Sequence, residues 1–145
     1  MMMTDPQEKN GGNDPHSLRV VYHNNGGLPD NKTYTAALLT SLTNHIQALT
    51  DPRYARSTGN GFSMTVVCHA AGVDLFGIAQ TDEQLKARLD TLRQQDVRFL
   101  VCANTLRARN IDWRSLYGVE ESDLVPSGVA ELAWLQMQGF AYIHL

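Results

Sequence analysis

The sequence predicts a single α/β domain of three layers, with helices covering both faces of a five-stranded, mainly parallel sheet. Three short segments, VVYH, TVVC and FLVC, are almost wholly apolar, as strands that are buried on both faces must be. Amphipathic helical segments alternate with these strands along the chain, which is the pattern of a parallel sheet with crossover helices. The length of 145 residues suits one domain with one full core.

The first half of the chain supplies two expected strands and one long helix. The first strand is expected at Leu18–His23, and the helix at Asn31–Thr50. Apolar side chains recur every three or four residues in that helix, so they share one face, and Asp30 suits its N-cap. The second strand is expected at Gly61–His69, and residues 72–79 indicate a buried connection.

The central part of the chain supplies a second amphipathic helix and the third strand. Thr81 opens a Thr-x-x-Gln capping-box pattern, in which two side chains satisfy free backbone donors, so the helix is expected to begin there. The third strand, Val97–Cys102, is nearly all apolar, and a short helix is expected at Asn104–Arg109. This strand is therefore expected to be buried.

The last part of the chain supplies two more strands with a helix between them. The fourth strand is brief, at Asp123–Pro126, and Ser127 suits the N-cap of the following helix, Val129–Gln138. Gly139 stands where a left-handed C-cap is favoured, and Phe140–His144 is the fifth strand. The last helix is apolar on more than one side, which indicates either a subunit contact or a deeply buried helix.

Residues 1–17 are expected to form a flexible tail ahead of a domain at Leu18–Leu145, because they are polar and rich in Gly, Pro, Asn and Asp. The net charge of -3 argues against nucleic acid or an anionic membrane as the main partner. The apolar runs are too short to cross a bilayer. With no secretory signal and only two cysteines, we expect a cytoplasmic protein with free thiols.

Chemically active side chains stand at the ends of three expected strands. In open parallel sheets, ligands bind beyond the carboxyl ends of the strands. The first strand ends at His23, the second at Cys68 and His69, and the third at Cys102. An imidazole or a thiol is therefore expected from each of these strands at one rim.

Cys102 is the first candidate, because a helix is expected to start immediately after it, with Asn104 and Thr105 as candidate caps. The positive end of a helix dipole and its free backbone N–H groups favour the thiolate, which is the nucleophilic form of cysteine. The alternative is that Cys102 is simply a small buried hydrophobe, as free cysteines often are.

The other thiol and the histidines leave several possibilities open. Cys68 could approach Cys102 and form a redox pair, or side-chain alternation could place the two on opposite faces of the sheet. His23 and His69 suit acid–base work, because imidazole titrates near neutral pH. No close-spaced pair of metal ligands exists, so no metal site is expected. His144 is expected to be terminal and incidental.

The familiar phosphate-binding motifs are absent from the sequence. There is no GxGxxG and no GxxxxGK[ST], so no nucleotide cofactor is expected, and no Ser/Thr/Gly-rich loop supports a flavin. The loop that contains Asn25 and Gly26 could hold an anion through its backbone amides, or it could be a plain turn. Together with Asn104 and Thr105, these residues are the candidates for a substrate rim.

Four stretches of the sequence resemble the DsrE/DsrF-like family. FLVCANTLRARNI and DLVPSGVAELAWLQMQGFAYIHL are similar to the C-terminal half of that family, while VVYH and TVVCHAAGVDL are similar to its first two strands. The resemblance covers Leu18–Leu145 and is closest to a branch with a C-x-N-T-L pattern. One departure is Arg109-Asn110-Ile111, where sulfur-relay members commonly carry Arg-Gly-Ile.

The resemblance implies an α/β/α domain that assembles into homotrimers or hexamers, with Cys102 at the position of the cysteine that relays sulfur as a persulfide. We therefore expect a sulfur carrier or sulfurtransferase-like protein, served by sulfur-donor and acceptor proteins. The alternative is a non-catalytic oligomeric module that binds a small anion or a partner protein at the rim of strand ends. Whether the protein is an enzyme stays open at this point.

Overall fold

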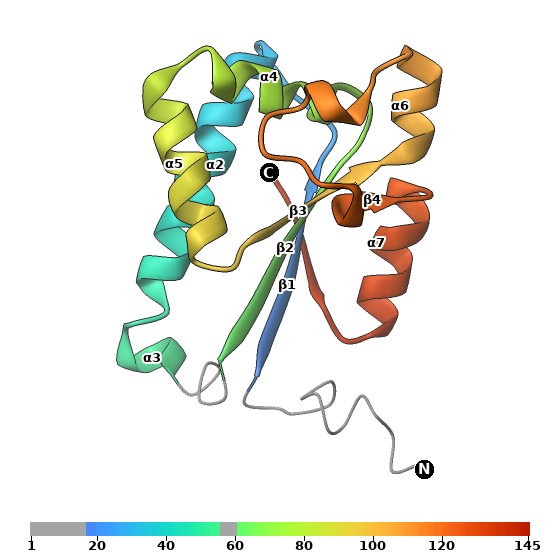
Figure 1. Ribbon diagram of the computed structural model, residues 1–145. Helices are drawn as coiled ribbons and strands as arrows, with labels where there is room; N and C mark the ends of the chain where they lie inside the picture. The colour runs from blue at the N-terminus through green and yellow to red at the C-terminus, as the bar shows by residue number, and fades with distance from the viewer. Residues whose placement is uncertain (1–16, 56–60) are drawn as a thin grey trace.

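The computed structural model describes residues 17–55 and 61–145 of the chain. Its centre is a five-stranded sheet in the order β4-β3-β2-β1-β5, and every pair of neighbours is parallel (Figure 1). The strands are β1 (Leu18–Asn24), β2 (Phe62–Cys68), β3 (Arg98–Cys102), β4 (Leu124–Val125) and β5 (Ala141–His144). The predicted fold class is therefore confirmed. The expected flexible tail lies outside the described residues, apart from Ser17.

Helices cover both faces of the sheet, but unequally. One face carries α2 (Asn31–Ala48), α4 (Leu75–Gln80) and α5 (Glu83–Gln94), while α7 (Gly128–Met137) packs on the other (Figure 1). The short helices α3 (Pro52–Ala55) and α6 (Ala103–Arg109) lie at the ends of longer elements, and η1 (Ala70–Asp74), η2 (Trp113–Ser115) and η3 (Glu121–Asp123) are single 3-10 turns. This arrangement makes the three expected layers.

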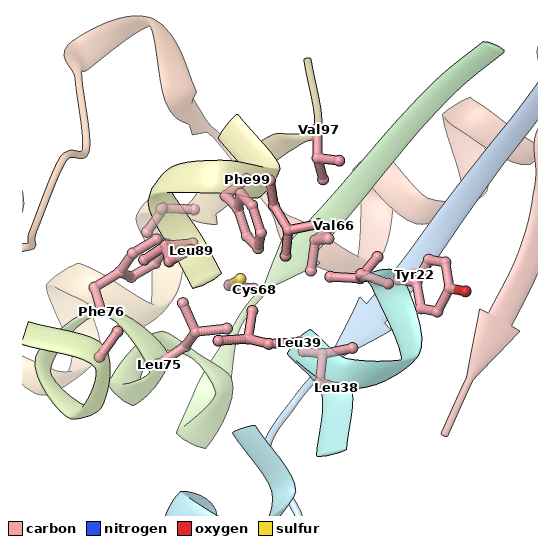
Figure 2. Close-up of a cluster of buried hydrophobic side chains, with 14 of the residues drawn as sticks. Tyr22, Leu38, Leu39, Val66, Cys68, Leu75, Phe76, Leu89, Val97 and Phe99 are labelled. Carbon is pink, nitrogen blue, oxygen red and sulfur yellow. The ribbon is translucent and has the colours of Figure 1, made fainter. Parts of the chain in front are cut away.

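The core is divided by the sheet into two clusters of buried side chains. The larger cluster lies under α2, α4 and α5, and Figure 2 shows part of it, including Phe76 against Phe99. The smaller cluster packs three strand residues against two leucines of α7; its members are Val21, Val67, Leu100, Leu132 and Leu135. Side chains that alternate along each strand thus enter different clusters, as the period of two requires.

Local capping explains where most helices begin and end. The carboxylate of Asp30 accepts the backbone N–H of Thr33 at the start of α2, and the Ser127 hydroxyl accepts the N–H of Ala130 at the start of α7. Gly139 follows α7 with φ +92°, a left-handed conformation that glycine adopts without steric cost. These three predictions are confirmed.

Two local predictions are wrong. Helix α5 is capped by Asp82 rather than Thr81: the Asp82 carboxylate accepts the N–H groups of Gln84 and Leu85, while the Thr81 hydroxyl bonds back to the carbonyl of Ile78. Residues 72–79, expected as a connection, are mostly helical, because η1 passes directly into α4. At the start of α5 two adjacent polar residues can fill the same role, and the bond of Thr81 to the preceding turn leaves the cap to Asp82.

The parallel arrangement brings the carboxyl ends of all strands to one edge of the sheet, the upper edge in Figure 1, where the C-terminus also lies. The candidate residues at the strand ends therefore lie at this upper edge.

Within residues 17–55 and 61–145, no helix has the length and apolar character needed to cross a membrane.

Candidate functional site

Cys102 is the last residue of β3 and is itself the N-cap of α6. Its Sγ accepts the backbone N–H of Thr105 at 3.4 Å. The sequence suggested Asn104 and Thr105 as the caps, so the cap stands two to three residues earlier than expected. A sulfur atom in the N-cap position lies against the free donors of the first turn, which is where a partial negative charge is favoured.

A second helix also acts on Cys102. The backbone N–H of Gly128, the first residue of α7, works with the N–H groups of Asn104 and Thr105 and the Thr105 side chain to lower the pKa of the thiol. Burial acts to raise the pKa of Cys102, but these hydrogen bonds outweigh it and hold the pKa below its ordinary value. The side chain is only 5% exposed. Two helix N-termini therefore converge on one nearly buried thiol.

Gly128 lies between Cys102 and His69. A Cβ at position 128 would stand 3.0 Å from the Cβ of His69 and 3.3 Å from the Cβ of Cys102. A larger residue here would crowd His69 and Cys102, which would have to shift by a few tenths of an ångström to make room for it. Two residues that the sequence predicted as catalytic thus flank the same glycine.

His69 contacts a cluster of aromatic rings that belong to β1 and β5. Its Nε2 lies 2.6 Å from Nε2 of His23, and the two rings stack with centroids 4.8 Å apart. His144 also stacks on His23, with ring centroids 4.6 Å apart, and the Tyr142 hydroxyl lies 2.5 Å from His23 Nδ1. The third predicted residue, His23, therefore contacts His69 and is the centre of a group that reaches the edge strand.

The pKa values of His23 and His69 both lie below the ordinary value of 6.5, so these two rings are neutral near pH 7. Burial, together with the nearby His69 and His144, lowers the pKa of His23 to about 4. Burial and His144 also lower the pKa of His69. A neutral imidazole next to a thiol can accept a proton, so His69 is in the form needed to help ionise Cys102.

The low pKa of His23 predicts a loss of stability in acid. The folded state favours the neutral ring, so this contribution is full above the ordinary pKa of 6.5 and disappears as the pH falls towards about 4. Because His23 is partly exposed, solvent screening makes the slope smaller than that of one full proton. Denaturant titrations between pH 7 and pH 4 should show a shallower loss of stability in His23→Gln than in the native protein. Equal slopes would contradict the assignment.

Cys68 lies on the opposite face of the sheet from Cys102. It pairs in register with Val101, so alternation directs its side chain into the larger core cluster, where Figure 2 shows the sulfur among Phe99, Leu89 and Leu75. Burial raises the pKa of Cys68 to about 12, against a smaller opposing effect of the Asn24 amide, whose Nδ2 is 3.5 Å away. The two thiols therefore form no redox pair in this fold, and Cys68 is a core residue.

The candidate rim residues divide into two groups. Asn104 and Thr105 contact Cys102, as described above. The Asn25 Oδ1 accepts from His144 Nε2 at 3.1 Å, and with Gly26 and Tyr34 Asn25 lines a cavity of about 440 Å³ beside the C-terminus. Among the described residues, the two groups of rim residues are thus connected through the cluster of His144, His23 and His69.

Asn110, the departure from the Arg-Gly-Ile pattern, occupies a backbone conformation that suits glycine. Asn110 ends α6 with φ 54° and ψ 50°, the left-handed conformation for which glycine is best suited and which asparagine tolerates better than most residues.

Within the described ranges, 17–55 and 61–145, no group of three or more His, Cys, Asp or Glu side chains is placed to hold a metal ion.

The fold and the site define a single-domain, parallel α/β protein whose candidate reactive group is a thiol at the carboxyl edge of its sheet. The model of the DsrE/DsrF-like family matches residues 18–145, and the chain belongs to this family. Membership connects the protein with sulfur relay at the level of the family, and it confirms the resemblance found in the sequence.

One solved structure shares both fold and sequence with the chain. It is a protein of unknown function, MTH1491, from Methanobacterium thermoautotrophicum, with a TM-score of 0.67 and 29% sequence identity. The match covers 88% of this chain and 99% of that chain. The search of curated proteins found no match.

Sequence reasoning missed three contributors to this site. His144 was expected to be incidental, but it stacks on His23, and Tyr142 of the same strand bonds to that ring. Gly128 lies against Cys102, and its N–H helps to lower the pKa of the thiol. The alternation of Tyr142 and His144 on one face of a strand was a usable signal, but only with knowledge that β5 lies beside β1.

Proposed function

We propose that the protein carries sulfur as a persulfide on Cys102. The observation that supports this most strongly is that the Cys102 sulfur caps α6, where it accepts the N–H of Thr105 at 3.4 Å, while the first residue of α7, Gly128, lies against Cys102 and helps to lower its pKa. Such a site stabilises a thiolate, and after transfer it would stabilise the negative charge of a persulfide as well.

The proposed chemistry is two successive displacements at sulfur. The Cys102 thiolate attacks the outer sulfur of a donor persulfide, a new S–S bond forms, and the donor leaves as a thiolate. An acceptor thiolate then attacks the outer sulfur of the Cys102 persulfide, which returns Cys102 to the thiolate. No electron or proton is gained or lost overall, so no oxidant is needed. The donor and the acceptor would both be thiol-bearing partner proteins.

His69 and His23 would serve this step as proton acceptors. His69 is next to Cys102 across Gly128, and its neutral ring can take the thiol proton before the attack. The bond between His69 and His23 would then share the positive charge with a second ring and with Tyr142. Asn104 and Thr105 would hold the sulfur in place.

The test is intact-mass measurement after incubation with a sulfane-sulfur donor such as polysulfide. The native protein should gain one sulfur atom, and the gain should be lost in Cys102→Ser and on treatment with a reductant. Cys68→Ala is the matched control and should still gain the atom, because Cys68 is fully buried with a pKa near 12. A native protein that takes up no sulfur would contradict the proposal.

One observation favours a second function, a non-catalytic module that binds a partner or a small anion at the rim. Cys102 is only 5% exposed, so a protein donor would have to move the residues around it to reach the sulfur. This second function predicts that Cys102→Ser alters neither binding nor assembly. It also predicts a thiol of ordinary reactivity, with a pKa of about 8.5.

We also propose that the protein assembles into a homo-oligomer, a trimer or a hexamer, through the outer surface of α7. That helix buries Leu132 and Leu135 against the sheet, but it leaves Trp134 55% exposed and Met137 82% exposed. Tyr142 on the neighbouring edge strand is exposed as well. Large apolar side chains that gather on one face are typical of protein interfaces.

A further inference from the structure

Arg109, the last residue of α6, ties that helix to the turn that follows β2. Its Nη1 donates to the carbonyl oxygen of Ala70 at 3.0 Å, and its Nη2 donates to Oδ1 of Asp74 at 2.8 Å. Both acceptors belong to η1. The guanidinium therefore fixes η1 at two points, with one nitrogen for each acceptor in a planar fork that an ammonium group lacks.

Asp74 is itself held from the other side. The Asn31 amide donates to Oδ2 of Asp74 at 3.2 Å and to the carbonyl oxygen of Ala71 at 3.0 Å. One carboxylate thus joins α2 and α6 through η1. Asp74, the second acceptor of Arg109, is therefore itself held in place, and the guanidinium keeps η1 in one position.

Ala70 has a backbone conformation that needs such support. Its φ is 52°, in the left-handed region that costs a residue with a Cβ about 1 kcal/mol. In this conformation the Ala70 N–H points at the Thr105 hydroxyl oxygen, 2.9 Å away. The hydrogen bond from Arg109 to the Ala70 carbonyl therefore also fixes the direction of the Ala70 N–H.

The Ala70 N–H in turn orients the Thr105 hydroxyl. A hydroxyl has one hydrogen to donate and two lone pairs. Because the Ala70 N–H occupies a lone pair of Oγ1, the hydroxyl hydrogen is free to point to Cys102. The Thr105 backbone N–H donates to the Cys102 sulfur at 3.4 Å, and the Thr105 side chain acts to lower the pKa of the thiol. A donor that points at the sulfur favours its charged form.

We infer that Arg109 is a positioning residue for Cys102, which acts by holding Ala70 so that the Thr105 hydroxyl donates to the sulfur. The chain of contacts runs from Arg109 through Ala70 and Thr105 to Cys102, with a hydrogen bond at each step. The inference rests on the proposed reactivity of Cys102, but it concerns the thiol alone and not what the thiol carries.

The test is the rate of Cys102 alkylation by iodoacetamide as a function of pH, followed by peptide-resolved mass spectrometry in the full chain. In Arg109→Met the midpoint of the rate profile should rise by roughly half a unit to one unit, so the rate at pH 7 should fall about 3- to 10-fold. Thermal unfolding followed by circular dichroism shows that the variant is folded. An unchanged midpoint in a folded Arg109→Met would overturn the inference.

Arg107→Met is the matched control, because Arg107 is an arginine of the same helix. Its guanidinium donates to the Asn104 side chain and, among the described residues, makes no hydrogen bond to η1. Its midpoint should stay at the native value. If Arg107→Met raises the midpoint as much as Arg109→Met does, the effect is one of general positive charge on α6, and the inference fails.

A double-mutant cycle separates the hydrogen-bonded route from a direct electric field. Thr105→Val removes the hydroxyl and should raise the midpoint, and adding Arg109→Met to it should cause no further change. An equal further rise in the Thr105→Val background would mean that Arg109 acts through space, which overturns the inference. Thr105→Ser, which keeps the hydroxyl, should restore the native midpoint.

Two further measurements keep the test decisive. If Arg109→Met does not fold, Arg109→Lys replaces it: one ammonium cannot serve both acceptors as the guanidinium does, so the midpoint should rise, and a native value would overturn the inference. Sulfur uptake by the native protein is scored separately. A midpoint that depends on Arg109 in a protein that takes up no sulfur supports the positioning role and contradicts the proposed sulfur relay.

Discussion

Gly72→Ala is expected to lower the free energy of unfolding by about 3 kcal/mol, because a side chain at this position collides with backbone. A Cβ on residue 72 would lie 2.6 Å from the carbonyl carbon of Asn24, and closer still to its oxygen. Neither atom can move freely, since the Asn24 carbonyl also accepts the N–H of His69 at 3.0 Å. Relief would require β1 and η1 to separate.

The measurement is thermal unfolding by circular dichroism, where the midpoint should fall by about 10 °C for a chain of this length. The sulfur chemistry should weaken as well, because η1 carries Ala70 and directly follows His69. Gly77→Ala is the matched control: a Cβ there meets no atom within 4 Å, and the residue lies inside α4. Alanine should stabilise that helix by about 1 kcal/mol. Equal effects of the two substitutions would contradict this account.

Trp134→Glu is expected to dissociate the proposed homo-oligomer completely while leaving each subunit folded. The side chain is 55% exposed on the outer side of α7, so a charge there meets water in the free subunit. In an assembled interface the same carboxylate would be buried without a partner, at a cost of several kcal/mol. Size-exclusion chromatography with light scattering should therefore give the mass of one chain.

Tyr54→Glu tests whether any new surface charge has this effect. Tyr54 is also an exposed aromatic residue, but it lies on α3, at the opposite side of the molecule from α7 in Figure 1. This variant should keep the native mass. A native protein that is monomeric at micromolar concentration, or a Trp134→Glu variant that keeps the native mass, would contradict the proposed interface.

Local sequence patterns predicted most of this fold correctly because the fold uses strong local signals. Continuous apolar strands require cover on both faces, and the caps at Asp30, Ser127 and Gly139 stand where side-chain oxygens or a left-handed residue are needed. The pattern was weaker at Thr81 and Asp82, because either residue can cap a helix. There the geometry of the preceding turn decided, since the Thr81 hydroxyl is used by Ile78.

The candidate site was predicted only in part. The fold class correctly directed attention to His23, His69 and Cys102 at the strand ends, and the structure places them in one contiguous group. It did not indicate that Cys68 faces the other side, because a shift of one residue in a strand exchanges its faces. Nor could it show that His144 contacts His23, because strand order is not written in the strands themselves.

The sequence by itself determined the layers of this protein, its main caps and the kinds of side chain that arrive at the carboxyl edge. These depend on burial and on contacts between residues that are close in the chain. Only the tertiary structure decided that the Gly128 N–H reaches the Cys102 sulfur, that β5 stacks His144 on His23, and that Arg109 holds Ala70. Such contacts join segments far apart in the chain, so they depend on strand order and packing rather than on local preference.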